Sequence, residues 1–268
     1  MAADTAAPGA VVTDVMDVQR RSLVLWGLAL AAIATMYISF YPLMGVEDMA
    51  VLVEDLPEAM INAFGYEQIG TPAGYITSSV YGLLGPILLS VFAIATGTRL
   101  LAGQEEDGTL ELELTAPISR RRAYTERLIA LWLNIVVLVG VLTTVTIALV
   151  VALDLDVAVG NILAGSLGLL LLILGFGTIG LAVGAITGRR AIGLGVAAAV
   201  AVIAFVLDAI GPTVDVAWMT AISPFSWYLE ERPLFTGFDW QGIALLAVVP
   251  VVAAAVGLMG YVRRDLMV

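Results

Sequence analysis

Six long apolar segments, separated by short polar links, dominate the sequence pattern. Each contains 21 to 26 residues, and a helix of that length rises about 30 Å or more, enough to cross the hydrocarbon core of a bilayer. The predicted spans are residues 23–44, 80–102, 128–153, 162–187, 191–211 and 242–262, flanked by short segments at 1–22 and 263–268. The pattern therefore predicts an all-α integral membrane protein with six transmembrane helices.

The amino-acid composition supports a membrane protein and limits the kinds of chemical site that the chain can form. Hydrophobic residues make up 60% of the chain and charged residues only 13%, which excludes a soluble domain of ordinary make-up. Cysteine and histidine are absent, so we expect no disulfide, metal site or bound cofactor. Asp208 is the one carboxylate inside a predicted span and has no visible partner there, so an intramembrane enzyme is poorly supported.

Arginine placement predicts an orientation. All 12 basic residues are arginine, and only Arg232 falls on the side that carries the acidic links at 46–79 and 212–240. Because positive charge concentrates in cytoplasmic loops, we expect both termini in the cytoplasm and a multi-pass protein of the plasma membrane.

Residues that cap or interrupt helices refine the predicted ends and shapes of the spans. Thr71 and Pro72 resemble an N-cap and first helical residue, so the second helix is expected to begin before the bilayer, and Pro86 to kink it. Residues 11–19 fit a short amphipathic surface helix. The G-x-x-x-G spacing of Gly180, Gly184 and Gly188 favours close helix packing, within the subunit rather than between subunits.

The link between the last two spans is too apolar for a solvated loop. Residues 212–240 carry several aromatic side chains around Pro224 and Pro233. We expect either a re-entrant segment or an interfacial loop anchored by aromatics, and the sequence leaves both open.

A polar island at residues 103–122 interrupts the apolar pattern. Its acids Glu105, Glu106 and Asp107 precede Gly108, where a helix N-terminus would favour negative charge. Leu110 and Leu114 share one helical face, Glu111 lies on another, Pro117 ends the element and Ser119 caps the next helix. The same leucines alternate with Glu111 and Glu113, which also fits a strand by period two.

The stretch EEDGTLELELTAPISRRR resembles the cytoplasmic coupling segment of ATP-binding-cassette exporter permeases of the second type. In that family E-x-x-x-G-T-L-E leads through P-[IV]-S-R into the next membrane helix. The resemblance implies a short amphipathic coupling helix between helices 2 and 3, and it favours helix over strand. Glu113 and Thr115 depart from the family's usual apolar or small residues. The implied ATPase-contacting residues are Glu105, Glu106, Asp107, Gly108, Thr109, Leu110, Glu111, Leu114, Pro117 and Arg120.

The resemblance also implies partners. A phosphate-binding P-loop requires lysine, which this sequence lacks, so ATP and magnesium must be bound by a separate cytoplasmic ATPase subunit. A second permease copy or a related permease, and membrane lipids, are the other expected partners; nucleic acid is not.

Three functions remain in competition. Few ionisable residues lie inside the spans, so an ATP-driven exporter of an amphiphilic or lipid-like substrate is the leading hypothesis. The alternatives are a non-transporting scaffold or sensor and the permease of a cofactor-maturation system. The lysine-free, acid-rich composition resembles that of proteins from salt-loving archaea.

The predicted orientation is testable by cysteine labelling, because the chain has no cysteine of its own. An impermeant thiol reagent added to intact cells should label single variants Asp55→Cys, Asp156→Cys and Glu231→Cys. It should spare Glu106→Cys and Arg190→Cys until the cells are opened. Labelling at position 106 from outside would reverse the orientation.

Overall fold

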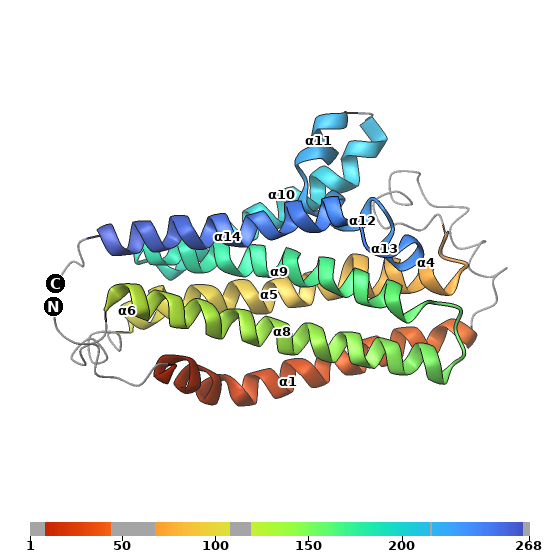
Figure 1. The fold of residues 1–268 in the computed structure, drawn as a ribbon, viewed down its shortest axis with the longest axis horizontal. Coiled ribbons are helices and arrows are strands. Elements are labelled where there is room, and N and C mark those ends of the chain that lie inside the picture. Colours follow the sequence, from red (N-terminus) through yellow and green to blue (C-terminus); the bar gives the residue numbers. More distant parts are fainter. Residues whose placement is uncertain (1–8, 44–67, 108–118, 215, 265–268) are drawn as a thin grey trace.

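The computed structural model describes residues 9–43, 68–107, 119–214 and 216–264. Its long helices lie roughly side by side, and α1 begins and α14 ends near α6, at the end of the bundle here called the α6 end (Figure 1). The main elements are α1 (Ala10–Phe40), α5 (Gly85–Thr98), α6 (Gln104–Glu106), α8 (Arg120–Ala152), α9 (Val159–Thr187), α10 (Arg190–Val214) and α14 (Trp240–Arg263).

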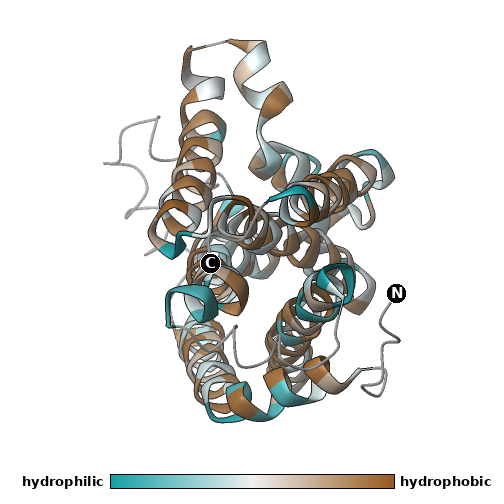
Figure 2. Cartoon of the chain, turned by 90° about the vertical axis from the view of Figure 1, so that its left-hand side faces the viewer, coloured by the Kyte–Doolittle hydropathy of each residue, from teal (hydrophilic) through white to brown (hydrophobic). Residues whose placement is uncertain are grey.

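Six helical segments are long and apolar enough to cross a membrane, which confirms the six-helix, all-α prediction. They are Ala10–Leu43, Pro72–Glu106, Arg120–Ala152, Val159–Thr187, Arg190–Pro212 and Trp240–Arg263. Most extend beyond the apolar windows, because a helix continues through polar residues once it has formed. Seen from the α6 end, apolar residues also colour outward-facing sides of the helices, as expected for a protein surrounded by lipid (Figure 2).

The N-terminal segment differs from the expected separate surface helix. Residues 11–19 run without a break into the first span as part of α1. Val15 is 5% exposed and Val18 69% exposed, so the valines do not share one buried face. The first turns of α1 instead pack against α8, its main neighbour throughout.

The second span combines α-helical and π-helical turns. Thr71 accepts a hydrogen bond from the Gly74 N–H and Pro72 opens α4 (Pro72–Ile76), as the sequence predicted. A π-helical segment, η3 (Thr77–Leu84), then precedes α5, and a second, η4 (Arg99–Gly103), connects α5 to α6. Pro86, at which the sequence predicts a kink, is the second residue of α5 and follows the π-helical turns of η3; the kink itself stays a prediction.

Helix α9 is the central helix of the bundle. It packs against α5, α8, α10 and α14, and its apolar window is more buried than that of any other span. Small residues permit this contact: a Cβ added at Gly97 would lie 2.4 Å from the Gly177 carbonyl oxygen, and one at Gly193 would lie 3.0 Å from that of Gly180. Gly180 therefore packs within the subunit, as predicted.

The link before α14 folds into three short helices: α11 (Ala217–Ile222), α12 (Pro224–Leu229) and α13 (Pro233–Thr236). Helix α12 is held inside the bundle. The Tyr228 hydroxyl donates to the Tyr81 carbonyl at 3.1 Å, and the Phe225 ring lies between those of Phe176 and Phe205. Helix α11 and the end of α10 stand away from the other helices (Figure 1).

The close approach of α5 to α9 leads to a prediction about the stability of the protein. Gly97→Ala should lower the free energy of unfolding by about 1–3 kcal/mol, because the new methyl group meets the α9 backbone, which cannot rotate away. Gly140→Ala is the matched control: its Cβ meets nothing within 4 Å, so the better helix former should be neutral or slightly stabilising. Thermal unfolding in detergent measures both, and equal melting temperatures would contradict the packing argument.

Candidate functional site

Four of the ten predicted coupling residues are described by the structure: Glu105, Glu106, Asp107 and Arg120. The other six lie outside the described residues, so the predicted coupling helix itself stays a prediction. They are Gly108, Thr109, Leu110, Glu111, Leu114 and Pro117.

The acids of the island stand at the end of the second span. Residues 104–106 form α6, which follows η4 directly, and Asp107 is its C-cap. Negative charge is unfavourable at the C-terminal end of a helix, so these carboxylates need positive partners from elsewhere. The helix predicted to start after these acids lies outside the described residues, so their placement before it stays a prediction.

Both glutamates find such partners on other helices. Glu106 Oε1 accepts a hydrogen bond of 2.9 Å from the Arg190 backbone N–H, the first of α10, where the positive end of the helix dipole favours an anion. Glu105 forms an ion pair with Arg264, directly after α14. Asp107 is exposed.

Arginines on α8 and after α14 complete the contacts. Arg127 is 1% exposed; its Nε donates to the Gln104 side-chain oxygen at 2.9 Å and its Nη1 to the Ala123 carbonyl at 3.1 Å. Arg120 Nη1 donates to the Arg264 carbonyl at 2.5 Å, and Arg264 Nη1 to the Ala185 carbonyl at 2.9 Å. Buried guanidinium groups need such partners, because unsatisfied charge is costly away from water.

We call this set the α6-end network: Gln104, Glu105, Glu106, Arg120, Arg127, Arg190 and Arg264. Its members join the end of the second span to α8, to the end of α9, to the start of α10 and to the end of α14. A displacement of α6 would therefore act on four other helices at once.

Glu126 extends the contacts of α8 to α1. Its carboxylate accepts hydrogen bonds from the Gly9 and Val11 N–H groups at 3.2 and 2.9 Å, and from Arg122 Nε at 2.7 Å. The first N–H groups of a helix lack partners within that helix, and a carboxylate satisfies them well. The start of α1 is thereby fixed to α8.

Sequence reasoning missed the roles of Gln104, Glu126 and Arg127. It placed every arginine except Arg232 on the cytoplasmic side, where the coupling segment was also expected, but it paired none of them with the island acids. That shared side was the available signal, since opposite charges at the ends of adjacent helices are expected to meet. The glutamine has no charge and gave no signal.

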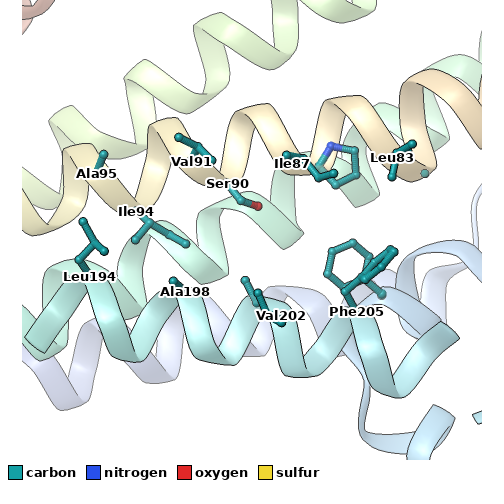
Figure 3. A pocket seen from close by; sticks show the side chains of 14 residues that line it. Leu83, Ile87, Ser90, Val91, Ile94, Ala95, Leu194, Ala198, Val202 and Phe205 are labelled. Carbon is teal, nitrogen blue, oxygen red and sulfur yellow. The ribbon is translucent and has the colours of Figure 1, made fainter. Parts of the chain in front are cut away.

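A groove of about 400 Å³ runs between α5 and α10 (Figure 3). Its lining is apolar except for Ser90 and includes Phe225 from α12. Within the described ranges no cluster of acids could hold a metal ion. The groove thus offers contact to an apolar chain and few hydrogen bonds.

Comparison with known families gives one result. A sequence model of the family described as ABC-2 family transporter protein matches residues 11–266, which is most of the chain. No curated protein matches the sequence.

The Glu105–Arg264 ion pair leads to a prediction about the coupling free energy between its two side chains. A double-mutant cycle of Glu105→Gln and Arg264→Gln should give a coupling free energy of about 1 kcal/mol, because the two side chains are largely shielded from water and lie in one network. Asp107→Asn combined with Arg264→Gln is the matched control and should be additive. Additive effects of the first pair on thermal unfolding would remove the ion pair from the network.

Proposed function

The chain belongs to the ABC-2 transporter family, and from that membership we propose that it is the export permease of an ATP-driven transporter. Members of this family are multi-pass membrane transport subunits and not the catalytic ones. The six apolar helices agree with that role. The class of the exported substrate and the way in which ATP hydrolysis drives movement of the permease are proposals.

The ATP-hydrolysing subunit is a separate cytoplasmic protein. A P-loop needs a lysine to contact the phosphates, and none of the 268 residues is lysine. ATP and magnesium are therefore bound by that partner, and this chain holds no cofactor. We propose two ATPase subunits with two permease chains, either two copies of this one or this one and a related permease.

The connection of α6 to four other helices carries the coupling proposal. Residues 104–107 lead directly into the segment expected to contact the ATPase, and the α6-end network ties them to α8, α9, α10 and α14. Tightly packed helices move as bodies and do not deform continuously. A displacement of the coupling segment by the ATPase would therefore move α8, α9, α10 and α14 as a group.

Orientation follows from the same proposal. The α6 end is the cytoplasmic end, with both chain termini on that side, and the chain resides in the plasma membrane. The eleven arginines assigned to this side support the assignment. The acidic, lysine-free composition supports a salt-loving archaeal source.

The substrate is an amphiphile or lipid-like molecule. Buried carboxylates or lysines, which pathways for small ions usually need, are scarce in the described spans, and the groove beside α5 is apolar. The alternatives remain a permease of a cofactor-maturation system and a non-transporting scaffold or sensor. Co-purification of an ATPase subunit separates the scaffold from both transport hypotheses.

ATPase stimulation in the reconstituted complex tests the function. Amphiphiles should raise the rate of ATP hydrolysis, whereas hydrophilic solutes of similar size should not, because only amphiphiles can exploit an apolar site. Stimulation by the hydrophilic set alone would contradict the substrate proposal.

The same assay tests coupling. Glu106→Arg places a cation against the start of α10, and Gly108→Pro fixes φ and removes an N–H in the predicted coupling segment, so either change should reduce stimulation several-fold. Asp156→Arg is the control charge reversal, exposed at the opposite end, and should leave stimulation intact. Full stimulation in both test variants would reduce residues 104–114 to a linker.

A further inference from the structure

The second span contains a proline that leaves one backbone carbonyl without its usual partner. Pro86 has no N–H, so the carbonyl to which residue 86 would donate has no donor at that position of its own helix. In an α-helix that carbonyl belongs to Gly82, four residues earlier, and in a π-helical turn it belongs to Tyr81, five residues earlier. The register of the turns before Pro86 therefore decides which carbonyl is unpaired.

The turns before the proline have the π-helical register. The Gly85 N–H donates to the Val80 carbonyl, five residues earlier, at the end of η3. That N–H would serve Tyr81 in an α-helix, so Tyr81 loses its α-helical donor to Val80. Its π-helical donor is missing, because that position is Pro86. The carbonyl left without a donor on its own helix is thus that of Tyr81.

A side chain from another element supplies the missing donor. The Tyr228 hydroxyl on α12 donates to the Tyr81 carbonyl at 3.1 Å. Tyr81 is 0% exposed and Tyr228 is 4% exposed, so water does not compete for this bond. A buried carbonyl without a donor is costly, because it has lost its hydrogen bond to water and gained none. The hydroxyl therefore replaces the N–H that the proline lacks.

Glycines admit both the π-helical register and the tyrosine. A Cβ added at Gly85 would lie 2.5 Å, and one at Gly82 2.9 Å, from the carbonyl oxygen five residues earlier. On α9, a Cβ added at Gly168 would lie 2.7 Å from the Tyr228 ring. A side chain at either of the first two positions would oppose the π-helical register, and one at the third would displace α12.

The Tyr81 side chain is fixed as well as its carbonyl. Its hydroxyl shares a hydrogen bond of 2.8 Å with Ser166 Oγ on α9. A change of register by one residue turns a helical segment by about 100°, because a turn holds about 3.6 residues. Such a rotation would move Tyr81 away from both Ser166 and Tyr228. The register of η3 and these two contacts are therefore gained or lost together.

We propose that Tyr228 is a positioning residue that selects the π-helical register of the second span by supplying the hydrogen bond that Pro86 cannot. In the α-helical register the unpaired carbonyl would be that of Gly82, on another side of the helix, and Tyr228 would lose its acceptor. A change of register therefore releases α12, and by thermodynamic reciprocity detachment of α12 favours a change of register.

This hydrogen bond gives the second span a contact at each end of the bundle. Helix α12 lies at the end opposite α6 (Figure 1), and the same span ends in the α6-end network. A rotation of the second span that breaks the π-helical register would therefore free the short helices before α14. The effect goes beyond the transport proposal and does not depend on which molecule is exported.

A double-mutant cycle with the proline tests the origin of the bond, by thermal unfolding of the purified full-length chain in detergent. Tyr228→Phe should lower the melting temperature by about 2–4 °C, because a buried carbonyl loses its donor. In a Pro86→Ala background the same change should cost about half as much or less, because residue 86 then has an N–H. Equal losses in both backgrounds, or no loss in either, would overturn the proposal.

Tyr124→Phe is the matched control for the loss of a buried hydroxyl. Tyr124 is 0% exposed, and within the described ranges its hydroxyl has no hydrogen-bond partner. Removing that hydroxyl should leave the melting temperature unchanged or raise it slightly. A loss equal to that of Tyr228→Phe would show that the Tyr228 effect is not due to its acceptor.

NMR reports the register itself, because Tyr81–Gly82 is the only place in the sequence where glycine follows tyrosine. Labelling tyrosine carbonyls with ¹³C and glycine nitrogens with ¹⁵N therefore gives one correlation through that peptide bond. Tyr228→Phe and Gly85→Ala should both move this signal in the same direction, since both disfavour the π-helical register. Gly140→Ala, whose Cβ meets nothing within 4 Å, should leave it in place. An unmoved signal in Tyr228→Phe would contradict register selection.

Hydrogen exchange tests the release of α12. Gly85→Ala changes no residue of α12, yet the α12 amides should exchange about fivefold faster, because Tyr228 loses its acceptor. Gly82→Ala, with its less severe contact, is a second variant in case the first does not fold. Gly140→Ala should not alter this exchange. No acceleration in α12, or an equal acceleration in all helices, would show that the register of the second span does not control α12.

Discussion

Close backbone contact between α9 and its neighbours is the constraint on which the rest of this structure depends. Lipid tails are as apolar as leucine, so burial alone does not hold membrane helices together, and short-range packing must do so. At Gly97 and Gly193 even one methyl group would meet backbone atoms of α9. Helices held this closely cannot slide past one another singly. The bundle therefore has few ways to move, and those ways displace whole helices.

Charged contacts gather at the α6 end of these helices, and they have a different role from the core. Helix ends leave N–H and C=O groups unpaired, and at the α6 end the side chains of other helices satisfy several of them. Glu106 and Glu126 contact the first N–H groups of α10 and α1, while Arg120 and Arg264 contact carbonyls at helix ends. The ion pairs add little net free energy. Their geometric effect is larger, because each fixes one helix end relative to another.

The sequence predicted features that depend on local chemistry. Hydropathy located all six spans, and Thr71 and Ser119 are N-caps as their types suggested. It could not predict features that depend on partners far along the chain. The run from residue 11 through α1 is stable because α8 supplies Glu126, which lies 115 residues away. The role of Gln104 depends in the same way on Arg127. Asp208, for which no partner was visible in sequence, is paired with Ser226 because α12 folds back onto α10.

The α6-end network lies close to the α5–α10 groove along the same helices, and that proximity has a mechanical consequence. Arg190 donates its N–H to Glu106 and precedes the lining residue Leu194 by four residues, and the Arg99 and Arg190 stems both lie against Gly103, just before α6 begins. A shift of α6 must therefore change the spacing of these two arginines. The groove lies between α5 and α10, and α10 has few neighbours in the subunit besides α9, α5 and the short helices after it. Movement at the α6 end would thus reach the groove along α5 and α10, because α9 packs closely against both helices and limits their deformation elsewhere.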